Sequence, residues 1–361
     1  AEVIMSTGPN LVDVLDAHRF DEAALLTWLQ KEIPDFGDDL QVKQFQGGQS
    51  NPTFMLTSGG NRYVLRKKPP GKTLPSAHMV EREYKVIRAL SDNTDVPVPK
   101  ARVLCEDSDL IGTPFYVMDF MEGRVLSHPA LPDLDKAERR PVHEAAIDTM
   151  AKMHAVDVNK VGLGDFGRPE GYVARQVARW SKQYEASKTD DMPAMDNLMK
   201  WLPENLPRND ECAIAHGDYR LGNLMLAPDK PEVIAILDWE LSTLGHPLAD
   251  LAYYCLPYHL SSGFEGMRGV VGEDLGEIGI PSEQETIERY CKASGRDGID
   301  DWHVFVSFSL FRLAAIVQGV YARALAGNAS NADALEVGKR ASILAEAGWS
   351  VAQKGSKGIS V

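Results

Sequence analysis

The stretch His216-Gly217-Asp218-Tyr219-Arg220-Leu221-Gly222-Asn223 decides the fold of this chain. It continues into an apolar run to Leu226. After a turn at residues 228–231, a second apolar run ends at Asp238. Two short apolar segments joined by a tight turn predict a β-hairpin. Such a hairpin would bring Asn223 and Asp238 to one side of a cleft.

Side chains of these types can support phosphoryl transfer. One carboxylate, Asp218, can accept the proton of an attacking hydroxyl, while the amide of Asn223 and the carboxylate of Asp238 can hold magnesium beside the phosphates of ATP. A His-x-Asp triplet by itself is common and can equally be a turn that caps a helix. The added presence of Asn223 and Asp238 favours the catalytic interpretation.

The flanking sequence predicts an α+β protein with two lobes. Strand patterns with turns between them precede residue 121, and helical patterns dominate after it. We predict an N-terminal segment and helix (1–34), a small antiparallel-sheet N-lobe (35–121) and a larger, mainly helical C-lobe with the catalytic loop and the acceptor site (122–361). The expected strands are 40–46, 53–57, 62–67, 101–106 and 114–121, and 213–239 is expected to be rich in strand. The expected helices are 20–33, 77–90, 134–156, 170–188, 283–294, 301–326 and 332–353.

The motif at 216–223 resembles the catalytic loop of the aminoglycoside phosphotransferase and choline kinase superfamily, a branch of the protein-kinase-like fold. The resemblance implies that Asp218 is the catalytic base, that Asn223 and Asp238 are magnesium ligands and that His216 braces the loop. Arg220 lies where protein kinases place a lysine against the transferred phosphate, so it is a candidate for charge stabilisation. Asp250 matches a family aspartate that anchors the catalytic segment.

Arg66 and Glu83 are the predicted ion pair of the N-lobe. The strand Tyr63-Val64-Leu65-Arg66 lies where protein kinases carry their phosphate-binding lysine. Strand alternation points Val64 and Arg66 to the same side, so that Val64 can cover the adenine and Arg66 can reach the phosphates. Glu83 falls within the apolar stripe of its helix, where an unpaired carboxylate would be costly. An exposed edge-strand charge is the alternative for Arg66, with Lys67 and Lys68 as competitors.

Two further segments are expected to contact the nucleotide. Gly47, Gly48, Ser50 and Asn51 lie in the turn between the first two strands, where backbone N–H groups can cradle phosphates. A Gly-Gly hairpin turn is otherwise only a turn. The second segment is the expected hinge, where adenine would bind to the backbone around Asp119 and Met121.

Several segments resemble more narrowly the phosphotransferase domains associated with acyl-CoA dehydrogenases. They are 45–53, 63–71 and 82–84, and the likeness runs from about residue 20 to 350. This resemblance implies a hydroxyacyl-CoA or a related hydroxy acid as the acceptor.

Arg312 and Arg323 bear on the acceptor independently of this likeness. They lie on one face of an apolar helix and flank Gly319, which indicates either a bound anion or internal carboxylates. We therefore expect an acidic or CoA-linked hydroxyl substrate, with these two arginines as candidate substrate ligands.

The composition of the chain limits the classes of molecule that we expect it to bind. The chain has 361 residues and a formal net charge of −14, which argues against sequence-independent nucleic-acid binding. The four cysteines are widely spaced and indicate a reducing, cytoplasmic compartment rather than a zinc site. The most apolar stretch, 304–317, is interrupted by Arg312 and too short to cross a bilayer, so no membrane partner is expected. Sequence leaves the oligomeric state open.

Other functions remain possible at this point. The alternatives are an aminoglycoside O-phosphotransferase, a nucleotide-binding pseudokinase and a metal-dependent phosphoester hydrolase. The hydrolase would use His216, Asp218, Asp238, His246 and Asp250 as metal ligands. It would leave Asn223, Arg66 and Glu83 without a role.

Overall fold

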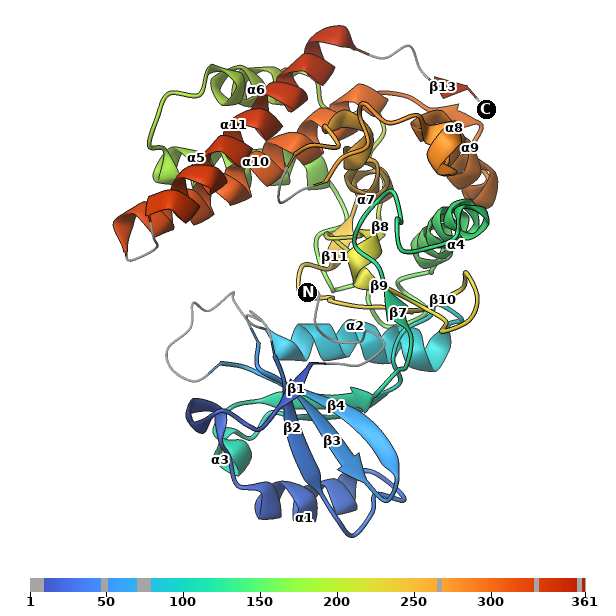
Figure 1. The fold of residues 1–361 in the computed structure, drawn as a ribbon, viewed down its shortest axis with the longest axis vertical. Coiled ribbons are helices and arrows are strands. Elements are labelled where there is room, and N and C mark those ends of the chain that lie inside the picture. Colours follow the sequence, from blue (N-terminus) through green and yellow to red (C-terminus); the bar gives the residue numbers. More distant parts are fainter. Residues whose placement is uncertain are drawn as a thin grey trace. The chain divides into compact units, whose positions relative to one another are not determined.

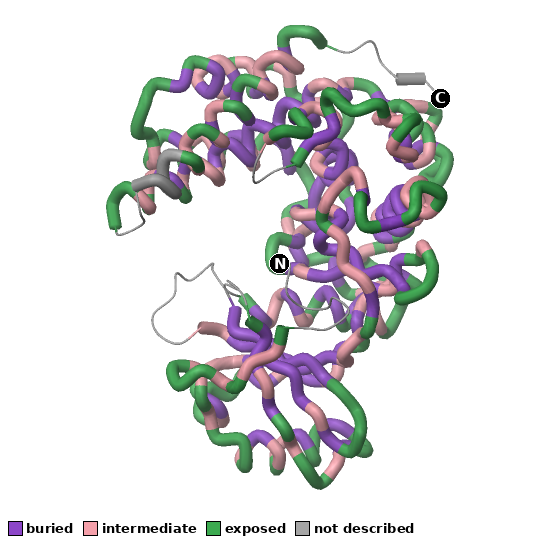
Figure 2. Tube along the Cα trace, viewed as in Figure 1, coloured by how far each residue is buried: buried purple, intermediate pink, exposed green. Residues whose placement is uncertain are grey.

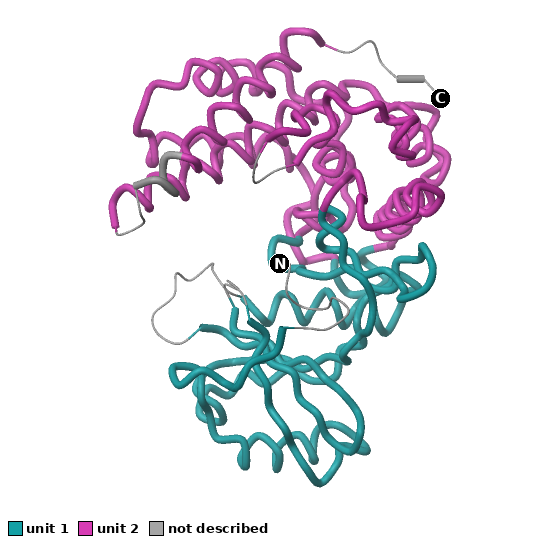
Figure 3. The backbone as a smooth tube through the Cα atoms, viewed as in Figure 1, with its two compact units in different colours: residues 1–127, 158–163, 220–242 teal, residues 128–157, 164–219, 243–361 magenta. Residues whose placement is uncertain are grey.

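The computed structural model describes residues 10–46, 51–69, 79–264, 268–327, 331–355 and 359–360. The chain divides into two compact units, shown in Figure 3. Unit 1 comprises residues 1–127, 158–163 and 220–242, and unit 2 comprises 128–157, 164–219 and 243–361. The segment 220–242, which the sequence assigned to the helical lobe, therefore packs with the N-terminal sheet. The lobe boundaries drawn from the sequence stay a prediction.

Unit 1 contains a six-stranded antiparallel sheet (Figure 1). The strand order is β1-β2-β3-β4-β6-β5. The two-residue turn Gly59-Gly60 joins β3 to β4, and both glycines have a positive φ, as a tight hairpin requires. The strands are β1 (Leu11–Val12), β2 (Gln41–Phe45), β3 (Thr53–Ser58), β4 (Asn61–Lys67), β5 (Ala101–Cys105) and β6 (Phe115–Asp119).

The two faces of this sheet have different roles. On one face, Leu65 and Val117 join a core with Leu25 and Leu29 of helix α1 (Glu22–Glu32). Because side chains alternate along a strand, Arg66 and its cross-strand neighbour Tyr116 point to the opposite face. Helix α2 (Val80–Asn93) lies on that opposite face. Unit 1 also contains the short helices η1 (Asp16–His18) and α3 (Ser108–Ile111).

A second, three-stranded sheet in unit 1 contains the predicted hairpin. Its order is β10-β9-β7, with β7 (Arg124–Val125), β9 (Leu224–Leu226) and β10 (Val233–Ile236). The register pairs Ile236 with Leu224. The short helix η2 (Leu221–Asn223) leads into β9. The hairpin inferred from the two apolar runs is therefore present.

Unit 2 is mainly helical. Its helices are α4 (Lys136–His154), α5 (Tyr172–Ser187), α6 (Pro193–Glu204), α7 (Pro247–Tyr254), η3 (Leu256–His259), α8 (Leu275–Ile278), α9 (Glu283–Ser294), α10 (Trp302–Ala326) and α11 (Asn331–Lys354). Two short strand pairs complete it: β8 (Ala213–Ala215) with β11 (Thr243–Gly245), and β12 (Gly298–Ile299) with β13 (Ile359–Ser360). The predicted fold class, an antiparallel sheet followed by helices, is confirmed.

Helix α10 forms the core of unit 2, and its buried stretch is visible in Figure 2. By length and composition it is the one helix among the described residues that could cross a membrane. However, 78% of its most apolar window is buried inside the protein. Its apolar character is thus accounted for by packing against α5, α7 and α11.

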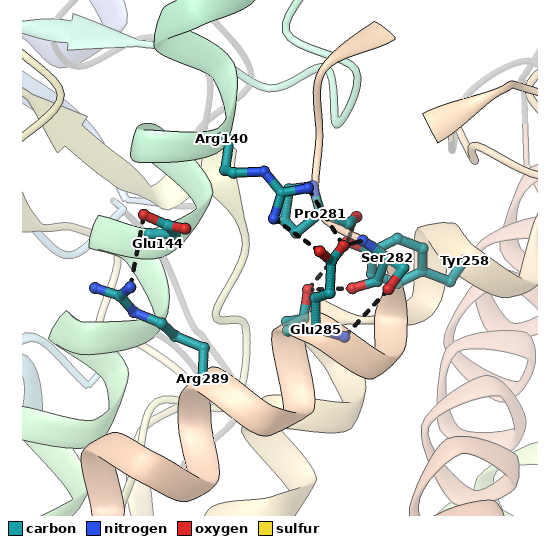
Figure 4. A network of polar contacts seen from close by, with 8 residues as sticks. Arg140, Glu144, Tyr258, Pro281, Ser282, Glu285 and Arg289 are labelled. Carbon is teal, nitrogen blue, oxygen red and sulfur yellow. Dashed lines mark hydrogen bonds and ion pairs between the residues drawn. The ribbon is translucent and has the colours of Figure 1, made fainter. Parts of the chain in front are cut away.

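Charged side chains join α4 to α9 at the surface of unit 2 (Figure 4). Arg140 of α4 contacts Glu285 at 3.2 Å, and Arg289 of α9 contacts Glu144 at 3.6 Å. Glu285 also completes a capping box with Ser282 at the start of α9. These partly exposed ion pairs each stabilise the fold by about 1 kcal/mol or less, so they mainly fix how α9 lies on α4.

Candidate active site

The predicted contact between Arg66 of β4 and Glu83 of α2 is present in unit 1. Arg66 Nε lies 3.1 Å from Glu83 Oε2, and both side chains are almost fully buried. The competing residues are occupied elsewhere: Lys68 pairs with Glu81 at 2.6 Å, and Lys67 donates to a backbone carbonyl at 3.0 Å. Strand alternation turns Lys67 to the other face, whereas Lys68 lies beyond the end of β4 and is held by Glu81.

Two further groups donate to the Glu83 carboxylate. Tyr116 Oη donates to Oε2 at 2.9 Å, and Asn51 Nδ2 donates to Oε1 at 3.1 Å. Burial raises the pKa of Glu83 to about 7, against the opposing effects of Arg66 and Tyr116. Burial disfavours the Arg66 guanidinium and would lower its pKa, but Glu83, Tyr116, Asp238 and Glu240 together outweigh this effect and raise the pKa of Arg66. Arg66 therefore stays charged, while Glu83 titrates near neutrality.

Asp238 and Glu240 bring two more carboxylates to the same guanidinium. Arg66 Nη2 lies 3.6 Å from Asp238 Oδ1 and 3.6 Å from Glu240 Oε2. Asp238 has a φ of 62°, a left-handed conformation that few non-glycine residues adopt. One guanidinium thus faces three carboxylates, which leaves the cluster with excess negative charge.

The hairpin places Asn223 and Asp238 on neighbouring strand ends. Leu237 N donates to the carbonyl oxygen of Asn223 at 2.8 Å, directly before Asp238. Asn223 is fully buried. The two side chains predicted as magnesium ligands are therefore brought to the same end of the β9–β10 pair, within unit 1.

The donors of this cluster fit a magnesium ion held together with phosphates. Asp238 Oδ1 is buried and accepts no hydrogen bond from the described residues. Within the same described part of the chain, no three His, Cys, Asp or Glu side chains form a complete metal site. Magnesium usually takes one or two protein carboxylates and completes its shell with phosphates and water, so a two-residue set suits it.

The other residues predicted to bind the nucleotide are placed as follows. Gly47, Gly48 and Ser50 lie outside the described residues. Val64 is fully buried beside Met118 of β6. Asp119 donates its N–H to the Lys100 carbonyl, and its carboxylate pairs with Arg102 at 2.6 Å. Met121 is half-buried, two residues beyond the end of β6.

In unit 2 the loop that contains His216 and Asp218 is held by Asp250 of α7. His216 N donates to Asp250 Oδ2 at 2.8 Å, and Gly217 N donates to Oδ1 at 2.9 Å. The Asp218 N–H donates in turn to His216 Nδ1 at 3.2 Å. Gly217 has a φ of 84°, so a residue without Cβ is needed at this bend. The carboxylate of Asp250 thus fixes the backbone on which Asp218 sits.

His154 and Tyr290 hold the Asp250 carboxylate in place. His154 of α4 contacts Asp250 Oδ2 at 3.0 Å through Nε2 and Tyr290 Oη at 2.8 Å through Nδ1. Burial would raise the pKa of Asp250, but the hydrogen bond and charge of His154 outweigh it and lower this pKa. Sequence reasoning missed His154 and Tyr290. The polar His154 at the end of an otherwise buried helix stripe was the available signal.

The hydrolase alternative fits this geometry poorly. The Asp250 carboxylate is used by backbone N–H groups, and His246 is buried as the N-cap of α7, where its Nδ1 accepts from Leu248 N. Burial also lowers the pKa of His246. Two of the five residues expected as metal ligands are thus part of the scaffold.

The three other predicted arginines occupy different environments. Arg220 belongs to unit 1, and its side chain lies so close to Gly222 that a Cβ there would come within 2.4 Å of its Nη1. Arg312 is buried and donates to the Gly217 carbonyl at 2.8 Å. Arg323 is exposed, eleven residues further along α10 and thus about 16 Å away along the helix axis. The helix therefore does not present Arg312 and Arg323 to one small anion.

Comparison with known proteins gives one family match. A model described as the phosphotransferase enzyme family matches residues 41–280. A crystal structure described as that of a candidate aminoglycoside phosphotransferase from Ralstonia eutropha is 46% identical, covers 94% of this chain and 100% of its own, and has a TM-score of 0.86.

Two less similar solved structures share the fold alone. Choline kinase from Cryptosporidium parvum is 14% identical with a TM-score of 0.65, covering 92% of this chain and 96% of its own. An aminoglycoside phosphotransferase in complex with AMP-PNP and hygromycin B is 15% identical with a TM-score of 0.57, covering 90% and 98%.

The similar curated proteins are longer than this chain. Mouse acyl-CoA dehydrogenase family member 10 is 46% identical over 87% of this chain, but only 29% of its own length is covered. Rat acyl-CoA dehydrogenase family member 11 is 42% identical over 97% of this chain and 45% of its own length. The chain spans less than half the length of these relatives.

Proposed function

This chain belongs to the phosphotransferase enzyme family, and on that premise we propose that it is a small-molecule kinase that uses ATP and magnesium. The proposed reaction transfers the γ-phosphate to a hydroxyl group of an acidic or CoA-linked hydroxy compound. The more general statement, that the chain is a phosphotransferase, rests on the family. The nucleotide, the metal and the acceptor are our proposal.

The arrangement of Asn223 and Asp238 is the observation that carries the proposal. The hairpin brings an amide and a carboxylate together, and Asp238 offers a buried oxygen without a hydrogen bond from the described residues. Arg66 lies 3.6 Å from that same oxygen. A cation site beside a buried arginine is what the phosphates of a nucleotide require.

Each residue of the site has one proposed task. Asp218 orients the acceptor hydroxyl and takes its proton, and the Asp250 network fixes its backbone. Arg66, held by Glu83, binds phosphate oxygens, and Arg220 offsets charge on the transferred group. Asn223 and Asp238 would hold magnesium, which when bound neutralises the negative charge on the phosphates.

The remaining predicted nucleotide contacts also stay within the proposal. Val64 would pack against the adenine. The backbone near Asp119 and Met121 would bind the adenine edge, and Gly47, Gly48, Ser50 and Asn51 would contact the phosphates. The solved relative in complex with AMP-PNP supports nucleotide use by this fold.

The acceptor is proposed from the relatives and from charge. The curated relatives are named acyl-CoA dehydrogenases, and this chain matches only a part of each. A phosphotransferase unit linked to such proteins suggests a hydroxyacyl-CoA or a hydroxy acid as substrate. We also propose a cytoplasmic location, since the four cysteines are free and three of them are buried.

An ADP-release assay tests the proposal. Purified protein with ATP and magnesium is offered hydroxyacyl-CoAs, free hydroxy acids and kanamycin, with ATP alone as the background. We expect turnover only with the acidic or CoA-linked compounds. Turnover of kanamycin alone would refute the acceptor class, and absence of ADP release with every acceptor would refute the kinase.

A further inference from the structure

Arg312 and Arg179 are two arginines of unit 2 that share one aromatic partner. The Arg179 guanidinium carbon lies 5.3 Å from the centre of the Trp180 ring, and that of Arg312 lies 5.9 Å from it. Arg312 also lies 5.8 Å from the Tyr253 ring. Trp180 is held in place by its own Nε1, which donates to Gln176 at 3.0 Å. We call Arg179, Trp180 and Arg312 the Trp180 cluster.

Neither arginine of the Trp180 cluster has a carboxylate partner among the residues that the structure describes. This is unusual in a chain with 52 acidic and 38 basic residues. Arg312 is only 8% exposed, and its Nε is buried without a hydrogen-bond acceptor in the described part of the chain. Burying a guanidinium with an unused N–H is costly, so an acceptor from outside the chain is expected there.

A third arginine increases the positive charge near this cluster. Arg175 lies one turn before Arg179 on α5, and like charges at this spacing destabilise a helix. Burial raises the pKa of the Tyr172 hydroxyl and so does Asp250, while the charges of Arg312, Arg175 and Arg179 lower it. An anion bound beside these arginines would offset the repulsion between their charges.

The distance from the Trp180 cluster to Asp218 sets the size of the ligand. Arg312 Nη1 donates to the Gly217 carbonyl, and that oxygen is separated from the Asp218 carboxyl carbon by five covalent bonds. The guanidinium therefore lies within roughly 8 Å of the Asp218 carboxylate. This is the length of a few carbon–carbon bonds, far shorter than the pantetheine arm that separates an acyl group from the phosphates of CoA.

We propose that the Trp180 cluster is the binding site for the carboxyl group of the acceptor substrate, with Arg312 as its main ligand and Arg179 as a second cation. The inference rests on the proposed kinase function and adds to it a specificity site. The ligand oxygen belongs to a carboxylate in a free hydroxy acid or to the thioester carbonyl in a hydroxyacyl-CoA. Arg312 at the same time positions Asp218 through Gly217, so it couples acceptor binding to the catalytic loop.

Arg179→Ala is the informative variant because Arg179 is exposed and does not touch the catalytic loop. Lys182→Ala removes the same charge from an exposed position on α5 and serves as the control. The acceptors are hydroxy acids with increasing separation between hydroxyl and carboxyl, their CoA thioesters and the uncharged hydroxy amides. The readouts are the KM for each acceptor, kcat, the KM for ATP, and calorimetric binding of each acceptor.

We expect Arg179→Ala to raise the acceptor KM about tenfold or more, with kcat and the KM for ATP nearly unchanged. Lys182→Ala should leave all three unchanged, and the hydroxy amides should not respond to either variant. Arg312→Lys should raise the acceptor KM and also lower kcat, because it alters the contact with Gly217. Its thermal unfolding temperature identifies a variant that simply fails to fold.

The outcomes separate this inference from the kinase proposal. An effect of Arg179→Ala on the free acid alone assigns the site to a carboxylate, and an effect on acid and thioester assigns it to the oxygen that both share. Equal KM values for wild type and Arg179→Ala overturn the inference while leaving the kinase intact. Acceptor binding that Arg179→Ala weakens, without ADP release, supports the site and refutes the kinase. Absence of both turnover and binding overturns both.

Discussion

Arg66 Nε lies 3.1 Å from Glu83 Oε2, and these two side chains are 3% and 2% exposed. A buried ion pair of this kind contributes little net stability, because removing both charges from water costs about as much as their attraction returns. Net stability therefore does not explain the pair, and in the proposed kinase it holds Arg66 for the phosphates. The guanidinium reaches Asp238 from the same position, so one contact ties the N-terminal sheet to the predicted metal ligands.

Glu83→Gln should reduce activity, and its effect on stability should depend on pH. The pKa of Glu83 is about 7 in the folded chain, above its ordinary value of 4.5, so its contribution to stability is present below pH 4.5 and lost as pH rises through 7. Wild type should thus lose up to about 3 kcal/mol relative to the variant between these pH values. Urea unfolding at pH 5 and pH 8 measures this difference, and an equal difference at both would contradict it.

Asp218→Asn should abolish turnover and spare nucleotide binding. Loss of a general base typically lowers kcat by about 10²–10⁴-fold. ATP affinity, measured by calorimetry with magnesium, should stay within about threefold of wild type, since Asp218 is assigned to the acceptor hydroxyl. Asp229→Asn, in the exposed turn of the hairpin, is the matched control. Unchanged kcat in Asp218→Asn would refute its assignment as the base.

Asp250→Asn should both destabilise unit 2 and inactivate the protein. The side-chain oxygen of the asparagine could still accept from Gly217 N. The N–H₂ group in the place of Oδ2 would then face His216 N, which is itself a donor. We expect a loss of about 2–4 kcal/mol in the free energy of unfolding. Asp148→Asn, which breaks an exposed pair with Arg289, should cost about 1 kcal/mol or less. Similar unfolding temperatures for both variants would argue against the bracing role of Asp250.

His143→Gln should reduce the fall in the free energy of unfolding that wild type shows at acidic pH. His143 is buried between Tyr254 Oη, at 2.7 Å, and the Pro129 carbonyl, at 2.8 Å, and burial lowers its pKa to about 4. A folded pKa below the ordinary 6.5 means that stability falls as pH drops from 6.5 towards 4, by up to about 3 kcal/mol. Unfolding free energies at pH 7.5 and 5.0 test this, with Tyr254→Phe as a variant that keeps the imidazole. A wild-type slope in His143→Gln would show that another group is responsible.

Helices α6 and α7, like the shorter η3 and α8, are helices of unit 2 that the sequence did not predict. Helix α6 starts at Pro193 and contains a second proline near its end, and prolines weaken a helical pattern. Helix α7 is only eight residues long and buried on most sides, so it shows no amphipathic period. Burial by neighbouring elements, which a local pattern does not contain, stabilises both.

The sequence by itself determined the fold class, the β9–β10 hairpin and the pairing of Arg66 with Glu83. These follow from local periods: strand alternation selects Arg66 over Lys67, and the helical stripe selects Glu83 over Glu81. Only the tertiary structure decided the partners of Arg312 and Asp250. Arg312 and Gly217 are 95 residues apart in the chain, and Asp250 and His216 are 34 apart. Contacts between residues so far apart depend on how whole helices and strands pack. A local sequence pattern does not predict which distant backbone group a buried side chain contacts.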